Sequence, residues 1–253
     1  MICPACTAGG RLESAPGGLR CGACQRLHPI LDQVPIVMGD LDGYLAEHGA
    51  ALAARGDLPP PVAARLRRFG PPSLRAGMQA AAAALRSPAD RLHHWALQQL
   101  THRFGAVLHL SCGVVGLSAP QVINLDHRWP LLRHATGHRL LADPLRPPFA
   151  PDSFEAVVML GALEASADPA ALLAVADTML QPGGLLLLGS AFAYDDAVTP
   201  PLRQVGEDRV IAFFETRGYA PRLGELNWMR AESARVKVHI SAMTLTGRKP
   251  SLL

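Results

Sequence analysis

The sequence predicts an α/β protein with a mainly parallel, doubly wound sheet, preceded by a small module of paired cysteines and a helical linker. Three observations lead to this prediction. Short apolar segments alternate with helical stretches from residue 106 onward, which is typical of a parallel sheet with crossover helices. Two Cys-x-x-Cys pairs lie within the first 24 residues, and a proline-punctuated stretch rich in Ala, Leu and Arg follows them. We therefore expect three parts, at residues 1–38, 39–104 and 105–253.

The composition excludes several classes of protein. Of the 253 residues, 49% are hydrophobic and 18% are charged, so the chain can bury a core and intrinsic disorder is not expected. The net charge of +3 is too small to indicate a nucleic-acid binder, which leaves that class only weakly supported. No apolar run approaches the roughly 18 residues that a membrane span needs, and no basic-then-apolar leader opens the chain. We expect a cytoplasmic protein without a membrane partner.

The cysteine spacing predicts a structural zinc site. Cys3, Cys6, Cys21 and Cys24 form two pairs separated by 14 residues, while Cys112 stands alone. In a reducing compartment disulfides are disfavoured, and four thiolates can surround Zn²⁺ as a tetrahedron with bonds of about 2.3 Å. Because all four positions would be filled by cysteine, no coordination position remains for catalysis. A redox-active pair is the alternative, but such a pair opens a helix within a βαβ pattern, which the sequence lacks here.

The run from Gln25 to Val37, QRLHPILDQVPIV, sharpens the zinc prediction. It resembles the "YPI-DGIP-L" tail of a family of small zinc-ribbon proteins that activate partner methyltransferases, a resemblance that covers about residues 1–38. The resemblance implies that the ribbon binds a protein or RNA partner and does no chemistry itself, with another methyltransferase subunit as a candidate for a protein partner. His28 takes the place of the family's tyrosine, and either a fifth metal ligand or a packed or solvated ring fits the sequence. We expect loss of zinc to unfold residues 1–38 and leave the sheet domain largely intact.

The linker is predicted to be helical. Periodic apolar positions favour helices near residues 41–54, 61–68, 73–86 and 88–103, separated by prolines. Arg65, Arg67 and Arg68 form a basic cluster on the second of these. A solvated helix face and a contact with RNA or an acidic partner are both compatible with the cluster.

The pattern of the second half predicts five strands with intervening helices. The strand-like segments are apolar and short, and they lie at residues 106–110, 122–126, 140–143, 154–160 and 185–188. Ligands of a parallel sheet bind beyond the carboxyl ends of its strands. Polar residues that follow these segments are therefore the candidates for a binding site.

Four motifs in this half resemble those of class I S-adenosylmethionine-dependent methyltransferases, over about residues 104–190. In chain order they are VLHLSCG, NLDHRWPLLRHA, ADPLRPPFAPDSFEAVVM and LQPGGLLLL. The resemblance implies a Rossmann-like methyltransferase fold and S-adenosylmethionine as a possible cofactor. It also implies that backbone groups of Ser111, Cys112 and Gly113 contact the methionine part, that Asp126 accepts both ribose hydroxyls, and that Asp143 faces the adenine. Both aspartates could instead cap helix N-termini.

The sequence departs from this pattern at the glycine-rich loop. His109 replaces the usual acid, Ser111 replaces the first glycine, and Val115 stands where a third glycine is expected. The 11 residues between Leu110 and Val122 barely reach the roughly 10–12 or more that a βαβ crossover with its helix needs. They also include Gly113, Gly116 and Pro120, so at most one or two helical turns fit. The helix that supports the cofactor's charged tail is therefore predicted to be trimmed or missing.

Two functions fit these patterns. The first is a non-catalytic partner, activator or scaffold subunit with an eroded cofactor site that docks through its zinc ribbon. The second is an active methyltransferase that acts on a small molecule, RNA or protein. By resemblance to small-molecule methyltransferases, Trp228 and Arg230 would lie on the substrate side, although core packing and surface charge also explain them. Tyr194 is a further substrate-side candidate, because it lies just after the fifth predicted strand, at the mouth of the sheet. No catalytic base stands out.

Overall fold

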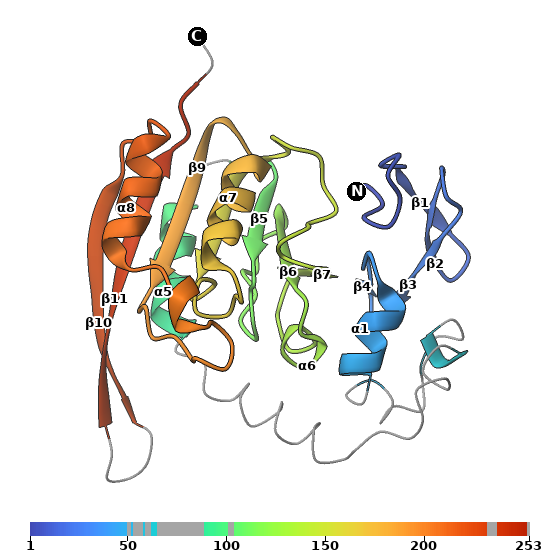
Figure 1. Cartoon of the computed structure of the whole chain (residues 1–253), viewed down its shortest axis with the longest axis horizontal. Coiled ribbons are helices and arrows are strands. Elements are labelled where there is room, and N and C mark those ends of the chain that lie inside the picture. Colours follow the sequence, from blue (N-terminus) through green and yellow to red (C-terminus); the bar gives the residue numbers. More distant parts are fainter. Residues whose placement is uncertain are drawn as a thin grey trace. The chain divides into compact units, whose positions relative to one another are not determined.

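The computed structural model describes residues 1–49, 52, 58, 62–64, 89–100, 104–231 and 237–251. The chain divides into two compact units, each discontinuous in sequence (Figure 1). The first unit comprises Met1–Ser87 and Gly113–Ala150, and the second comprises Pro88–Cys112 and Pro151–Leu253. Among the described helices, none combines the length and the apolar character that a membrane crossing requires.

The first unit begins with a four-stranded antiparallel sheet. Its order is β1-β2-β3-β4, with bounds Leu12–Ala15, Gly18–Cys21, Leu27–Leu31 and Val34–Pro35. Gly18 allows β2 to pass close to β3, because a Cβ atom there would overlap the carbonyl oxygen of His28. Of the cysteines of the predicted ribbon, Cys21 ends β2 and Cys24 follows it in the turn before β3, whereas Cys3 and Cys6 precede β1.

The same unit contains the parallel pair β6 (Val122–Asp126) and β7 (His138–Leu141). The segment after β4 continues along β7, since Ile36 forms a parallel bridge with Leu141 and the Val37 N–H donates to the Leu141 carbonyl at 2.8 Å. At the chain's start, the Ile2 N–H donates to the Pro148 carbonyl at 2.9 Å. The segment that follows the small sheet therefore lies along the β7 edge of the parallel pair. The sequence alone predicts that residues 1–38 unfold on their own, and it does not predict these contacts.

A helix follows the small sheet. Asp40 caps the N-terminus of α1 (Leu41–His48) by accepting a hydrogen bond from the Gly43 N–H at 2.9 Å. The Tyr44 hydroxyl on α1 accepts a bond from the Trp129 N–H at 3.3 Å, at the start of α6 (Trp129–Leu132). The helix predicted over 41–54 is thus confirmed over 41–48. The predicted helix at 73–86 and the basic cluster Arg65, Arg67 and Arg68 lie outside the described residues.

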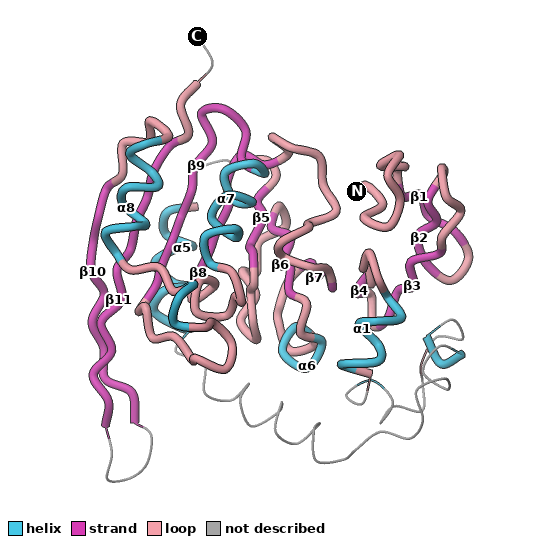
Figure 2. Tube along the Cα trace, in the orientation of Figure 1, coloured by secondary structure: helices cyan, strands magenta, loops and turns pink. Residues whose placement is uncertain are grey.

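The second unit holds strands in the order β10-β11-β9-β8-β5 (Figure 2). The parallel members are β5 (Val107–Leu110), β8 (Phe154–Leu160) and β9 (Leu180–Ser190). The antiparallel hairpin β10 (Arg222–Ala231) and β11 (Lys237–Arg248) joins them through β11, which pairs with β9. The helical elements are α5 (Ala89–Gln99), α7 (Pro169–Met179), the 3₁₀ turn η2 (Pro201–Arg203) and α8 (Glu207–Thr216).

The strand predictions agree with the structure, with two shifts. The segment predicted over 140–143 is paired over 138–141, and β9 starts at Leu180 rather than at 185. All four residues of β5 are buried, as are six of the seven in β8. Such continuous apolar runs are typical of parallel strands covered on both faces. Helices α5 and α7 both contact β8 and contribute to this burial.

Candidate functional site

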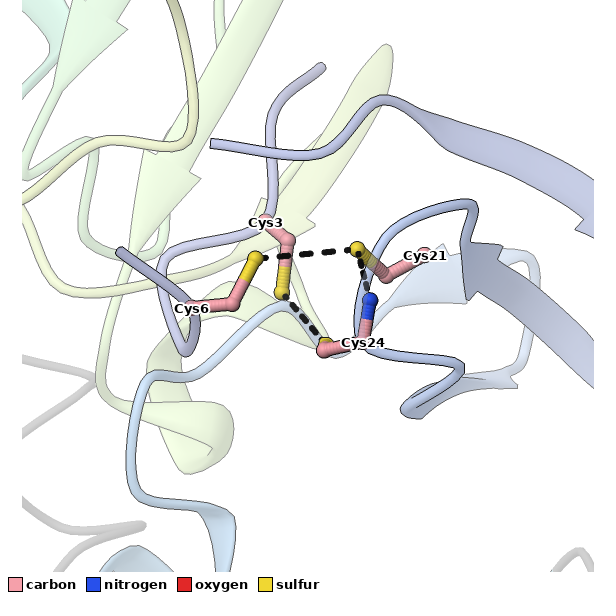
Figure 3. A group of neighbouring side chains, drawn as sticks. All are labelled: Cys3, Cys6, Cys21 and Cys24. Atoms are coloured by element: carbon pink, nitrogen blue, oxygen red, sulfur yellow. Dashed lines mark hydrogen bonds between the residues drawn. The ribbon is translucent and has the colours of Figure 1, made fainter. Parts of the chain in front are cut away.

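Four cysteines of the N-terminal segment lie close enough together to hold a metal ion (Figure 3). The sulfur atoms of Cys3, Cys6, Cys21 and Cys24 all lie within 4.8 Å of one another. The Cys3–Cys24 and Cys6–Cys21 sulfur pairs are each 3.8 Å apart. Ligands at 2.3 Å around a tetrahedral zinc ion would be separated by about 3.8 Å. The predicted set is therefore brought together, with this spacing in the Cys3–Cys24 and Cys6–Cys21 pairs and no sulfur pair further apart than 4.8 Å.

The protein environment differs among these thiols. Burial raises the pKa of the Cys3 thiol to about 12, with neighbouring thiols adding to the effect of desolvation. Hydrogen bonding from the Cys24 N–H, helped by the Ala23 N–H, lowers the pKa of the Cys21 thiol to about 7. Binding of a metal requires thiolates and therefore releases protons from this set.

His28 lies beside the cysteines as a packed ring. Only 1% of its surface is exposed, and its Nε2 atom is 3.4 Å from the Cys3 sulfur. The solvated ring that the sequence allowed is therefore wrong. Among the described residues, the potential ligand atoms that group closely are the four cysteine sulfurs.

Asp126 lies at the carboxyl end of β6, where the motif resemblance placed it, but its carboxylate faces inward. The residue is fully buried. Its Oδ1 accepts the Arg128 backbone N–H at 2.8 Å and the Arg128 Nε at 3.0 Å. Its Oδ2 accepts the Arg128 Nη2 at 2.9 Å and the Gly113 N–H at 2.9 Å. Both oxygens of the predicted ribose acceptor are thus bonded to the protein itself.

Electrostatics stabilise this arrangement. Burial alone would raise the pKa of Asp126, but the Arg128 guanidinium and its hydrogen bonds outweigh burial and lower it. The neighbouring His127 has its pKa lowered by burial, against the opposing attraction of Asp126, whose Oδ1 is 3.7 Å from Nδ1. Asp126 therefore stays ionised and held by Arg128.

The connection between β5 and β6 contains neither helix nor strand over residues 111–121, which confirms the expected loss of the crossover helix. Asn124 on β6 anchors the replacement loop. Its Oδ1 accepts the Leu117 N–H at 2.8 Å, and its Nδ2 donates to the carbonyls of Leu117, Thr136 and His138. Sequence reasoning missed Asn124, although a lone amide inside the apolar strand VINLD was a visible signal.

The glycine-loop residues fall on either side of the division between the units. In the second unit, Ser111 and Cys112 are buried, and Ser111 has a positive φ of 53°. In the first unit, Gly113 has a φ of 61° and donates to Asp126. A Cβ at Gly116 would overlap the Thr136 carbonyl oxygen, so this glycine serves a close approach of two loops.

His109, which replaces the family acid, is fully buried in β5. Its ring meets that of His93 from α5 edge to face, with ring centroids 5.4 Å apart. The position where the motif resemblance expects an acid is therefore occupied by one ring of a packed histidine pair.

The remaining sequence-predicted residues have local contacts. The Asp143 Oδ1 accepts the Leu145 N–H at 2.9 Å, so it caps the turn after β7. The Tyr194 hydroxyl, in the loop after β9, donates to the Val205 carbonyl at 2.9 Å, and burial raises its pKa to about 12. Trp228 is half-buried on β10, and Arg230 lies two positions further along the same strand.

Sequence reasoning gave no role to Glu164, which fastens two loops of the second unit. Its Oε1 accepts the Ser190 hydroxyl and the Ala191 N–H, each at 2.8 Å, and the Phe192 N–H at 2.9 Å. These contacts join the loop after β8 to the end of β9. The arrangement is structural crosslinking at the carboxyl ends of two strands.

The family model for a "Methyltransferase domain" matches residues 112–188. Among solved structures, the YcgJ protein from Bacillus subtilis is 14% identical, with 64% of this chain and 99% of that chain covered and a TM-score of 0.51. A SAM-dependent methyltransferase from Thermotoga maritima is 13% identical, with 62% and 91% covered and a TM-score of 0.45. No curated protein sequence matches significantly. The chain therefore has a methyltransferase fold, as its motifs predicted.

A further match is to the complex between the Haloferax volcanii Trm112 methyltransferase activator and a methyltransferase. It is 14% identical, with 72% of this chain and 99% of that chain covered and a TM-score of 0.49.

Proposed function

We propose that this methyltransferase-fold chain is a non-catalytic partner, activator or scaffold subunit whose S-adenosylmethionine site is closed by its own residues. In this proposal residues 1–38 are a zinc ribbon, 39–104 a linker and 105–253 the methyltransferase-like domain. The main support for this proposal is the environment of Asp126. Its side chain is fully buried, and its two carboxylate oxygens accept hydrogen bonds from Arg128 and Gly113.

A ribose diol needs acceptor positions on the Asp126 carboxylate. A carboxylate has about four lone-pair positions, and four N–H groups already point at this one. A cofactor would have to displace the bidentate, charge-assisted hydrogen bonds between Arg128 and Asp126. Breaking a buried ion pair costs about 3–5 kcal/mol, or about two to four orders of magnitude in affinity. The closed carboxylate therefore weighs heavily against tight cofactor binding.

The loop over residues 111–121 supports the same conclusion. Helix N-termini supply free amide donors and a favourable dipole to charged ligand groups. In this chain the connection after β5 has no helix, and its Gly113 amide is directed at Asp126. His109 adds a third change, because a buried ring replaces the expected acid.

The cysteine geometry supports a structural zinc ion held by Cys3, Cys6, Cys21 and Cys24. Bound there, zinc would supply crosslinking of the N-terminal segment to the end of β2, and four cysteine ligands would leave no position for a substrate. The ribbon residues 22–26 are exposed and lie outside its contacts with β7, so they form the surface that we propose for a protein partner.

The test of the closed site is calorimetric titration of the zinc-loaded full chain with S-adenosylmethionine and S-adenosylhomocysteine. We expect no saturable heat with either ligand up to about 1 mM. A micromolar dissociation constant would overturn the closed site. Asp126→Asn is the matched control, because a binding heat that persists in this variant comes from a site that does not use the carboxylate.

The partner surface is tested separately by placing a photo-crosslinking residue at Ala23, which is exposed in the ribbon. We expect crosslinks to a protein, whereas crosslinks to RNA would indicate a nucleic-acid partner instead. A crosslinker at Ala220, which is exposed in the second unit, is the control for non-specific capture.

An active methyltransferase is the second candidate, and the family match over residues 112–188 favours it. In that case Ser111, Cys112, Gly113, Asp126 and Asp143 would contact the cofactor. Tyr194, Trp228 and Arg230 would face a small-molecule, RNA or protein substrate. This candidate requires Arg128 to leave Asp126 when the cofactor binds. The titration distinguishes the two, because only the active enzyme needs micromolar affinity.

A further inference from the structure

Each of the two buried cysteines of the cluster has a nitrogen atom at the same distance from its sulfur. The Cys24 backbone N–H donates to the Cys21 sulfur at 3.4 Å, and the His28 Nε2 is 3.4 Å from the Cys3 sulfur. Cys21 and Cys3 are 0% and 3% exposed, whereas Cys24 is exposed to solvent and Cys6 is half-buried. The His28 ring nitrogen thus lies beside the sulfur of a cysteine that is almost fully buried.

Four thiolates around a divalent ion leave a net charge of −2. Burying such charge is costly unless hydrogen-bond donors compensate it. Water can serve the exposed Cys24 sulfur, and a backbone amide serves Cys21. An imidazole N–H placed at Cys3 would serve the remaining buried sulfur. Groups that hydrogen-bond to metal ligands in this way orient the ligands and tune the affinity for the metal.

The His28 ring is fixed by the small sheet. His28 lies in β3, opposite Leu19 of β2, two residues before the Cys21 ligand. The two strands approach each other closely at Gly18, where any side chain would collide with the His28 carbonyl oxygen. The pairing of β3 with β2 therefore places the His28 ring beside the Cys3 sulfur.

We propose that His28 is a positioning residue of the metal site, whose neutral ring donates its Nε2 proton to the Cys3 sulfur and stabilises that thiolate. The inference rests on the zinc site in the proposed function, but it is independent of whether the cofactor site is closed. It assigns to the ring neither a bond to the metal nor a role in catalysis.

The first test uses the full chain loaded with Co²⁺, whose sulfur-to-metal charge-transfer band reports electron density on the ligands. We expect His28→Phe to shift this band to lower energy and, by chelator competition, to weaken Zn²⁺ binding about 10- to 100-fold. His28→Gln keeps an N–H donor and should restore part of both properties. His134→Phe, at an exposed histidine, is the matched control and should resemble the unmodified chain.

An unchanged band and unchanged affinity in His28→Phe would overturn the proposal. If that variant does not fold, ¹⁵N chemical shifts of the His28 ring in the zinc-loaded, unmodified chain decide the matter. We expect Nε2 to carry the proton. An unprotonated Nε2, or a shift typical of a metal-bound nitrogen, would contradict the assignment. Failure of the chain to give any charge-transfer band would instead overturn the zinc site itself.

Discussion

Arg128 and Asp126 form a two-pronged ion pair only two residues apart in sequence, with Nε to Oδ1 at 3.0 Å and Nη2 to Oδ2 at 2.9 Å. The Arg128 backbone amide bonds the same carboxylate. A planar guanidinium matches a carboxylate in this geometry, which lysine cannot reproduce. The pair lies at the carboxyl end of β6, where the motif resemblance would place the ribose of a cofactor.

Removal of Arg128 should strongly destabilise the chain. In Arg128→Ala the Asp126 carboxylate would remain buried without its charge partner, and we expect unfolding to become easier by about 3–5 kcal/mol. Urea denaturation followed by circular dichroism measures the change. Arg133→Ala, at an exposed arginine one turn later, should stay within about 0.5 kcal/mol. Equal effects of the two variants would show that the ion pair contributes little.

The same pair predicts a pH dependence. The pKa of Asp126 is lowered in the folded chain from an ordinary value of 3.8, so the unfolded state binds more protons in acid. Its stabilising contribution is therefore fully present above that value and is lost as pH falls through the depressed pKa. Unfolding free energies measured between neutral and acidic pH should decline less in Asp126→Asn. A parallel decline in both proteins would assign the acid sensitivity to other carboxylates.

Zinc removal should destabilise both the ribbon and the β7 region that it contacts. The ribbon's tail pairs with β7 through Ile36 and Leu141, and the Ile2 amide bonds the Pro148 carbonyl. We therefore expect chelation to increase hydrogen exchange both in residues 1–38 and in residues 138–148. This differs from the sequence-based expectation that the sheet domain stays largely intact. Unchanged exchange over 138–148 would restore that expectation, and residues 207–216 of α8 serve as the internal control.

Gly116→Ala tests the loop that replaces the crossover helix. A Cβ there would overlap the Thr136 carbonyl oxygen, so we expect a loss of about 1–3 kcal/mol or more from overpacking. Thermal unfolding measures the loss. Gly206→Ala is the control, because a Cβ at Gly206 meets no atom within 4 Å, and its effect should stay below about 1 kcal/mol. Similar losses in both variants would contradict the close approach of the two loops.

The sequence was informative where a pattern repeats locally. Apolar runs placed β5, β6 and β8, and Cys-x-x-Cys spacing placed the four sulfurs, because each depends on neighbours along the chain. The orientation of Asp126 depends on a rotamer of Arg128, which motif comparison does not reveal. The pairing of Ile36 with Leu141 depends on an edge formed far along the chain. Asn124 was missed because its four hydrogen bonds join loops whose paths the sequence does not define.

The bridge between Ile36 and Leu141 also sets an order of events during synthesis. The ribbon's tail leaves the ribosome before the strand edge on which it rests, because that edge is encoded 105 residues later. At about 5–20 residues per second, the tail waits about 5–20 seconds for that edge. An unpaired strand edge invites wrong partners during such a wait. Early metal capture would give the nascent ribbon a defined shape before its final neighbour has been translated.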